Sequence, residues 1–505
     1  MWDVIVIGSG IGGMAAAAAL AKKGRRVLLL EQHSVAGGQT QTFRRDVWEF
    51  ATGVHYVSGI GEAGSPGQFG RLLDWLTDGT LRFAACANPY DIVRLPGFEF
   101  GIAHPESAYR DALHQAFPDQ QRAIERWFDN CHAARRAGMA LMMSHHLPGW
   151  MAWFFRLLRG AQSHHWLQRT LAAELMELDD PRLRAVLGAR WGNYGAPPDR
   201  APFIEHAWVT GAYDRGAYYP IGGPARFAQT LLPPLTAAGG QCRLGADVRR
   251  ILVEGGRVAG VEVVEQGQVR QERSPQVISD IGVANTLGCL DEAVARPWAR
   301  QLERLQPGTG FVALYIGLEG DIGAAGATSA NHWIYDSDDI GRLWQNPADE
   351  DAPGLFVSFP SMKDPRPGVA PTAEVLALTD AAAFAPWLAD AQAQDDYAAF
   401  KDWVAGRLLA QFKRHFPRLA PMVRFHEAAT PLTQRRFVRA AGGAMYGIEM
   451  TIERLASDAL GTRTPIPGLL LAGQDTIGPG VEAAFMSGLM AAANLEPSLW
   501  RELRA

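Results

Sequence analysis

The chain has 505 residues, of which 48% are hydrophobic and 20% charged, and its formal net charge is −5. This length allows roughly two to four domains with sizeable cores, and so mild a charge argues against nucleic acid as the main partner. The 4 cysteines form no C-x-x-C pair, which argues against a structural metal site and favours a reducing cytosol. No basic segment precedes the first apolar run, and no run reaches the roughly 18 residues of a membrane span, so we expect neither a signal peptide nor a transmembrane helix.

The chain begins with a pattern that predicts a strand, a glycine turn, a helix and a second strand. Residues 2–7 and 26–30 are the apolar strands, and small residues over 14–21 predict the helix. Gly8-Ser9-Gly10-Ile11-Gly12-Gly13 stands before the helix, and Glu31 ends the second strand. This is the dinucleotide-binding βαβ arrangement, in which the glycine backbone and the helix N-terminus receive a pyrophosphate. We expect Glu31 to accept hydrogen bonds from ribose hydroxyls.

Two further segments favour FAD among the dinucleotides. Gly37-Gly38-Gln39-Thr40 is placed to run along the same pyrophosphate, and Gly473-Gln474-Asp475 ends a short buried strand, where an acid can bind a ribityl chain. A last helix over 481–494 can face the flavin pyrimidine with its positive dipole end, which would stabilise reduced flavin. The predicted FAD contacts are Gly8, Ser9, Gly10, Ile11, Gly12, Gly13, Glu31, Gln32, Gly37, Gly38, Gln39, Thr40, Gly53, Val54, His55, Val248, Gly473, Asp475, Gly480 and Val481.

After the glycine pair we expect a hairpin over 42–56, a helix over 67–78, and two or three short strands within 83–103. Helical periodicity then dominates from Glu106 to about Ala189. Within it, Met139 to Leu167 is rich in Met, Trp, Phe and Arg, and two interpretations stay open: a surface that docks on a membrane or a buried helix pair. Its two histidine pairs are adjacent in sequence, so their members point in different directions, and we predict no metal site.

The second half of the chain alternates strands and helices. A helix over 225–238 precedes strands at 241–244, 248–254, 257–266 and 276–280, which predict a β-meander inserted into the nucleotide domain. Strands at 309–319, 355–359 and 375–379, with a helix over 391–415, are expected to roof the flavin. We divide the chain into a discontinuous FAD-binding domain (1–75, 225–295 and 464–505), a substrate-binding domain (76–104, 190–224 and 296–463) and a helical subdomain (105–189).

Longer motifs give the chain a resemblance to a known family. It resembles the flavin-dependent retinol saturase and carotenoid isomerase group of the phytoene desaturase-like amine oxidase superfamily. The resemblance implies an α/β fold, in which a Rossmann-like, glutathione-reductase-type FAD-binding domain carries a mixed-sheet substrate domain and a helical subdomain. Two positions depart from the group, because an aspartate is usual at Ala51 and a basic residue at Ile221. The motifs are Gly37-Gly38 with Thr42-Phe43, 49–56, 219–223, 359–365, 430–433, 444–448, 464–468 and 473–475.

The resemblance implies an FAD that faces a long apolar tunnel for a polyene or isoprenoid, such as a carotenoid or retinoid. Saturation would pass a hydride from reduced flavin to one alkene carbon and a proton to its neighbour, and His55, Tyr56 and Tyr446 are the candidate proton donors. The alternative is a redox-neutral cis-trans isomerase or a desaturase acting at the same site. A non-catalytic lipid-binding escort and an amine oxidase are weaker alternatives.

The remaining expectations concern partners and location. No second G-x-G-x-x-G is found, so reduced flavin would need an external donor, either NAD(P)H or a reduced carrier. We expect a cytoplasmic protein that binds a hydrophobic small molecule, with peripheral contact to the inner face of a membrane through 139–167 as one interpretation. The sequence leaves the oligomeric state open.

Overall fold

The computed structural model describes residues 1–62, 64–146, 165–389 and 394–504. The first strand lies in the middle of a five-stranded parallel sheet, which confirms the predicted Rossmann-like unit. The strands of this sheet come from distant parts of the chain. In spatial order they are β11 (Gln241–Leu244), β2 (Val27–Glu31), β1 (Val4–Ile7), β15 (Val277–Ser279) and β21 (Leu469–Leu471).

Both faces of the sheet are covered, because alternate residues of a strand point to opposite sides. Val4 and Val6 pack against helices, whereas Ile5 and Ile7 pack against a three-stranded antiparallel sheet and one helix. The helices on the first side are α1 (Ile11–Lys22), α9 (Arg226–Ala237) and α17 (Val481–Leu495). The second side is covered by β12 (Ala246–Glu254), β13 (Arg257–Glu265), β14 (Gln268–Arg273) and α11 (Glu292–Leu302).

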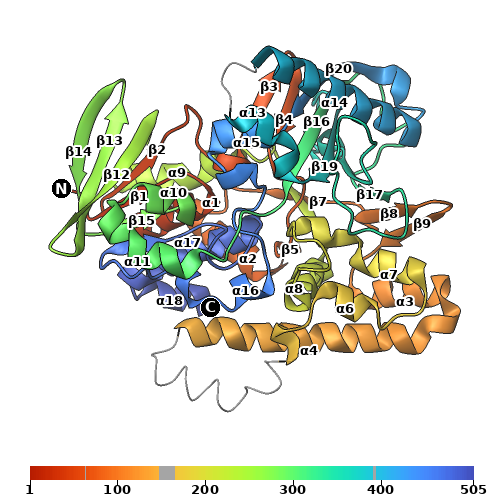
Figure 1. Cartoon of the computed structure of the whole chain (residues 1–505), viewed down its shortest axis with the longest axis horizontal. Helices are drawn as coiled ribbons and strands as arrows, with labels where there is room; N and C mark the ends of the chain where they lie inside the picture. Colours follow the sequence, from red (N-terminus) through yellow and green to blue (C-terminus); the bar gives the residue numbers. More distant parts are fainter. Residues whose placement is uncertain (63, 147–164, 390–393, 505) are drawn as a thin grey trace.

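A seven-stranded mixed sheet forms the second large layer and lies beside the nucleotide lobe (Figure 1). One face packs against α14 (Gln394–His415), and the other contributes Phe311 and Tyr315 to a separate aromatic core. β17 and β8 are parallel neighbours, and the other pairs are antiparallel. In spatial order the strands are β20 (Val423–Ala429), β16 (Gly310–Leu318), β19 (Thr372–Thr379), β18 (Gly354–Ser358), β17 (Asn331–Tyr335), β8 (Asp91–Leu95) and β9 (Phe98–Ile102).

A group of helices lies below this sheet in Figure 1, where α4 extends along the edge of the molecule. All but α8 fall within the predicted helical block of 105–189, and together these helices bury Leu113, Trp127 and Phe203 in one core. This group consists of α3 (Glu106–Ala116), α4 (Gln121–His146), α6 (Leu171–Leu175), α7 (Pro181–Gly188) and α8 (Phe203–Ala212).

Most of the Met139 to Leu167 segment lies outside the described residues, including 147–164. At its two described ends, Met139 is 50% exposed, whereas Trp166 and Leu167 pack against the core. Among the described residues, no helix is both long enough and apolar enough to cross a membrane. The membrane-docking interpretation of this segment therefore stays a prediction.

The other predicted elements agree with the structure to within a few residues, whereas six strands and several short helices were missed. β14 completes the predicted meander, and β17 and β20 complete the roof sheet. The boundaries of the three proposed domains stay a prediction. The remaining elements are β3 (Thr42–Arg45), β4 (Trp48–Ala51), β5 (Gly61–Glu62), β6 (Ser65–Pro66), α2 (Gln68–Thr77), β7 (Phe83–Ala85), β10 (Tyr218–Pro220), α10 (Val283–Gly288), α12 (Pro360–Lys363), α13 (Ala385–Ala389), α15 (Pro431–Val438), α16 (Ile452–Leu455), α18 (Leu499–Arg504) and short 3-10 turns.

Candidate active site

The glycine turn between β1 and α1 is held by the acid at the end of β2. Glu31 Oε2 accepts hydrogen bonds from the Ser9 backbone N–H at 2.9 Å and from the Ser9 hydroxyl at 2.7 Å. Its Oε1 accepts from the His33 N–H at 2.7 Å. The predicted ribose acid thus also fixes the shape of the turn, since it ties the ends of two neighbouring parallel strands together.

The glycines of this turn leave no room for side chains. A Cβ built on Gly12 would lie 2.6 Å from Asp280 Oδ1 and 2.8 Å from the Ala484 carbonyl oxygen, and one on Gly13 would collide with the Gly8 carbonyl. The helix that follows has no side-chain cap at its N-terminus. Its first N–H groups are therefore available to an anionic ligand, as a pyrophosphate site requires.

The second glycine pair lies against the first. A Cβ on Gly38 would be 3.3 Å from the Gly10 Cα, and the Gly37 N–H donates to the Ser9 carbonyl at 3.1 Å. Gln39 Nε2 donates to the Met445 carbonyl at 3.2 Å. The two predicted phosphate-binding segments are therefore adjacent in space, and Gln39 links them to the segment that contains Tyr446.

Asp475, the predicted carboxy-terminal acid, accepts hydrogen bonds from two backbone N–H groups. Asp475 is buried, its Oδ2 accepts from the Val283 N–H at 2.9 Å, and its Oδ1 accepts from the Ile448 N–H at 2.9 Å. Nearby, α17 begins after Gly480 without a side-chain cap. Asp475 thus joins three loops around the cavity, and further lone pairs remain for the predicted ribityl contact.

All these segments line one continuous cavity of about 1210 Å³. This volume exceeds the ~300–1,000 Å³ of ordinary ligand pockets, which suits a site that holds a dinucleotide and a second molecule. Every predicted FAD contact lines the cavity except Ser9 and Gly13. All three candidate proton donors, His55, Tyr56 and Tyr446, also line it. Three features fit FAD: the glycine cradle, by which we mean Gly8 to Gly13 with Gly37 and Gly38; the uncapped N-termini of α1 and α17; and the size of the cavity. Among the described residues, no group of His, Cys, Asp and Glu could hold a metal ion.

His55 contacts a buried carboxyl group that the sequence did not reveal. Its Nδ1 lies 2.8 Å from Oε2 of Glu374, a fully buried residue of β19. The other oxygen of Glu374 accepts from the Ala51 N–H at 2.7 Å. Because a carboxylate accepts, Nδ1 carries a proton, and His55 Nε2 is left buried without a hydrogen-bond partner among the described residues.

The two candidate tyrosines differ in what holds their hydroxyls. The Tyr56 hydroxyl donates to Asp91 Oδ2 at 3.2 Å and accepts from Asn193 Nδ2 at 3.0 Å. Burial, and next the nearby Asp91, raise the pKa of Tyr56 well above its usual value. Burial also raises the pKa of Tyr446, whose ring packs near Gly195. Both phenols therefore keep their protons at physiological pH.

A buried lysine stands behind the loop that carries His55. Lys363 Nζ donates to the His55 carbonyl at 2.7 Å, to Ser358 Oγ at 2.8 Å and to Asn331 Oδ1. Burial lowers the pKa of Lys363. Lys363 follows the Phe359-Pro360-Ser361-Met362 motif, and the structure assigns it a positioning role for the loop.

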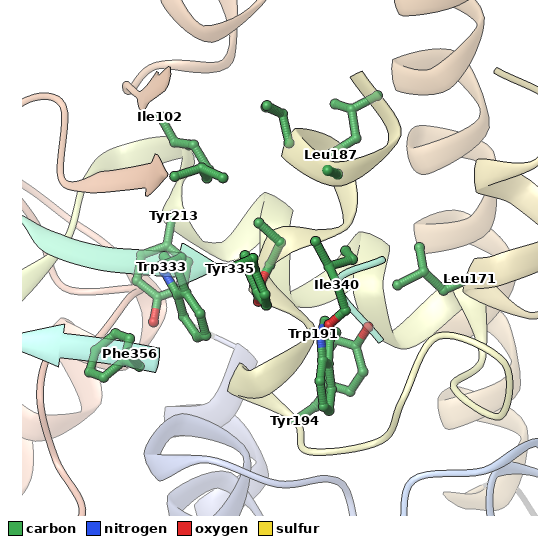
Figure 2. Packing of buried hydrophobic residues seen from close by; sticks show 14 of the residues in the cluster. Ile102, Leu171, Leu187, Trp191, Tyr194, Tyr213, Trp333, Tyr335, Ile340 and Phe356 are labelled. Atoms are coloured by element: carbon green, nitrogen blue, oxygen red, sulfur yellow. Dashed lines mark hydrogen bonds between the residues drawn. The ribbon is translucent and has the colours of Figure 1, made fainter. Parts of the chain in front are cut away.

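Aromatic side chains form one wall of the cavity. Figure 2 shows Trp333, Phe356 and Tyr213 gathered on one side of this core, with Tyr335 and Trp191 beside them, and all five line the cavity. The Trp333 and Phe356 rings are 4.7 Å apart. The chamber beside His55 is therefore predominantly apolar.

A buried carboxyl group of α8 also lines the cavity. Glu205 of α8 is 5% exposed and lines the cavity, and its Oε1 lies near Gly478, in the loop that precedes α17. Burial raises the pKa of Glu205 to about 7, against the opposing effect of Arg454. Glu205 thus changes charge close to physiological pH, and no motif in the sequence pointed to it.

Comparisons with known proteins agree with this arrangement. Residues 6–69 match the family model described as an NAD(P)-binding Rossmann-like domain. The chain is 32% identical to human all-trans-retinol 13,14-reductase over 99% of its own length and 87% of the relative. It is 25% identical to chloroplastic prolycopene isomerase from Daucus carota over 100% of its own length and 81% of the relative.

A solved structure shares the fold along the whole chain. Cyclohexylamine oxidase from Brevibacterium oxydans superposes with a TM-score of 0.61, covering 98% of this chain and 99% of that one, at 17% sequence identity. At this identity the likeness shows the fold alone. It confirms the predicted α/β fold, with a Rossmann-like domain and a mixed sheet.

Proposed function

Because this chain belongs to the all-trans-retinol 13,14-reductase family, within the retinol saturase and carotenoid isomerase group, we propose that it saturates a carbon–carbon double bond of a hydrophobic polyene with FAD as cofactor. The observation that most strongly supports this proposal is the single cavity that joins the glycine turn to the aromatic chamber beside His55. It is an oxidoreductase that acts on C=C bonds. A retinoid or a carotenoid-like isoprenoid is the substrate class.

The chamber suits a substrate that has few groups for hydrogen bonding. Affinity for a polyene comes from burial of apolar area, at roughly 25 cal/mol per Å². Trp333, Phe356 and Tyr213 supply such area. They also keep water away from the reacting carbons.

Bound FAD, once reduced, supplies a hydride for one alkene carbon. His55 supports the second half of the reaction, because its Nε2 is free to deliver a proton to the neighbouring carbon. Glu374 orients the ring through Nδ1 and stabilises the imidazolium that carries this proton. Tyr56 is less suited as the donor, since its hydroxyl hydrogen is directed to Asp91.

A redox-neutral cis-trans isomerase is the second candidate, and the likeness to prolycopene isomerase favours it. The reductase is preferred because identity to that isomerase is 25%, against 32% to the reductase. Both reactions use the same cavity. They differ in whether the product gains mass.

Three finer points belong to the proposal. Reduced flavin is regenerated by an external donor, either NAD(P)H or a reduced carrier. The protein works in the cytoplasm, where residues 139–167 contact the inner face of a membrane that holds the apolar substrate. The exposed Met139 at the described end of α4, which also lines the cavity, supports such an entry route.

The proposal is tested by the spectrum and the products of the purified protein. A flavin absorption spectrum is expected, and incubation of the reduced enzyme with retinoids, carotenoids and unsaturated acyl lipids should yield a product two mass units heavier. A product of equal mass with a shifted retention time would instead establish an isomerase. Unchanged lipids across the whole panel would contradict both candidates.

A further inference from the structure

Asp280 occupies a position that the proposed chemistry does not use. It directly follows β15, the neighbour of β1 in the parallel sheet, and its N–H donates to the Ile7 carbonyl at 2.8 Å. Ligands of such sheets bind outside the carboxyl ends of the strands. Asp280 therefore stands at the edge where the glycine turn receives the cofactor, and it lines the same cavity.

The side chain of Asp280 fills the space that the glycines leave open. A Cβ on Gly10 would collide with its Oδ2, and one on Gly12 or Gly473 would lie 2.6 Å from its Oδ1. Oδ2 is buried and has no hydrogen-bond partner among the described residues. A buried polar atom without a partner is costly, so this oxygen indicates a ligand contact.

The surroundings of Asp280 disfavour a negative charge. The charged side chains that act on it are Glu31, at the end of β2, and Asp475, after β21, and both are acidic. Burial, followed by these two acids, raises the pKa of Asp280 to about 8, against the opposing effect of the Gly13 N–H. At neutral pH the group is mainly a carboxylic acid, which has an O–H to donate.

We propose that Asp280 binds the FAD pyrophosphate as a neutral carboxylic acid, whose O–H donates a hydrogen bond to a phosphate oxygen. The inference rests on the FAD site of the proposed function, and it adds a binding residue outside the glycine motifs. An ionised Asp280 would repel the pyrophosphate. A protonated one supplies a further donor beside the free N–H groups at the uncapped N-terminus of α1.

FAD binding should therefore be coupled to the uptake of a proton by Asp280. The pyrophosphate raises the pKa of Asp280 further, so FAD binds with proton uptake wherever free Asp280 is ionised. FAD affinity is therefore constant below about pH 7.5 and falls by up to about tenfold per pH unit above the pKa of about 8. FAD release from the holoenzyme accelerates over the same range.

The test measures FAD binding without any substrate. The full-length chain is stripped of flavin and titrated with FAD from pH 6.5 to 9.5 by flavin fluorescence, and calorimetry in two buffers of different ionisation enthalpy counts the protons taken up. Three variants are compared: Asp280→Asn, which keeps a donor and cannot ionise; Asp280→Ala, which lacks a donor; and Asp111→Asn, an exposed carboxylate on α3 that serves as the control.

The wild type and Asp111→Asn should lose FAD affinity above pH 8 and take up close to one proton per FAD at pH 9. Asp280→Asn should bind with a flat pH profile, without this uptake, and at least fivefold more tightly than the wild type at pH 9. Asp280→Ala should bind at least fivefold more weakly than Asp280→Asn at pH 7, since one hydrogen bond to an anion is lost.

A wild-type profile that is flat to pH 9.5, or an Asp280→Asn profile that keeps the wild-type slope, would overturn the proposal. Equal affinity of the Asn and Ala variants at pH 7 would also overturn it, because no donor would then be at work. If FAD binds as described but no polyene is reduced, the proposed reaction fails while this inference stands. If FAD does not bind at any pH, both the proposed reaction and this inference are wrong.

Discussion

His55 Nδ1 lies 2.8 Å from Glu374 Oε2, across 319 residues of sequence. The pair joins the loop after β4 to the first half of β19, and His55 lines the cavity. One imidazole nitrogen is thereby committed to a buried carboxyl group, and the other is buried without a hydrogen-bond partner among the described residues. This geometry makes His55 the preferred proton donor and leads to the first prediction.

Replacement of His55 by Gln should lower the rate of polyene reduction by roughly 10²–10⁴-fold, the usual contribution of general acid catalysis. FAD content should remain near one per chain. Glu374→Gln should cause a smaller loss and shift the pH–rate profile, because the imidazolium loses its carboxylate. Stopped-flow mixing of reduced enzyme with the polyene measures the rate directly.

His132 supplies the matched control for this experiment. It forms a comparable pair with Glu106, at 2.9 Å, in the helical group and away from the cavity. His132→Gln should leave the rate unchanged. If His55→Gln keeps more than a third of the wild-type rate with FAD bound, another group delivers the proton.

The charge of Glu205 should make substrate affinity depend on pH. Because burial raises its pKa to about 7, Glu205 is neutral below that pH and places a negative charge in the apolar chamber above it. Affinity for an uncharged polyene should therefore fall as pH rises, approaching tenfold per unit above pH 7 for a substrate that binds only the neutral form. Fluorescence titration of oxidised holoenzyme with the polyene gives the dissociation constant.

Glu205→Gln should abolish this pH dependence and bind at pH 8.5 as the wild type does at pH 6. Glu319→Gln, which removes an exposed carboxylate that pairs with Arg424, should behave as the wild type. A Glu205→Gln protein that retained the full wild-type pH profile would refute the assignment.

Lys363 should matter for stability more than an ordinary surface lysine does. Lys363→Met leaves the His55 carbonyl, Ser358 and Asn331 without their shared donor, which should cost about 2–4 kcal/mol in the free energy of unfolding. Lys22→Met breaks only an exposed pair with Asp78 and should cost at most about 1 kcal/mol. Denaturant unfolding of the two variants tests the difference, and equal losses would show that the buried contacts carry no special weight.

The glycine cradle predicts which glycine substitutions the cofactor tolerates. Gly12→Ala should reduce bound FAD to less than a tenth per chain, because its Cβ would meet backbone atoms of Ala484 and Gly473. Gly406→Ala lies in α14, where a Cβ meets open space, and should stabilise the protein by roughly 0.5–1 kcal/mol. Flavin absorbance per chain, measured after gel filtration, tests this prediction. Normal flavin content in Gly12→Ala would contradict the proposed role of the glycine cradle.

The sequence predicted those parts of the site that neighbouring residues define. Gly10 and Glu31 belong to the strand–helix–strand unit that opens the chain, and Gly38 follows it within a few residues. Glu374 could not be predicted, because its partner His55 lies 319 residues away in the sequence and the two meet only through tertiary packing. Asp280 ends the strand predicted over 276–280, but that strand was assigned to an inserted meander, whereas the structure places it parallel to β1 at the edge where such sheets bind ligands.

The central claim is that reduced flavin in this cavity transfers its electrons to a carbon–carbon double bond. The most direct measurement is an anaerobic single turnover, in which FAD-loaded enzyme is reduced stoichiometrically and mixed with all-trans-retinol or a carotenoid. Flavin absorbance near 450 nm should return as one polyene per flavin gains two mass units. Flavin that stays reduced while the polyene keeps its mass, for every polyene offered, would contradict the account.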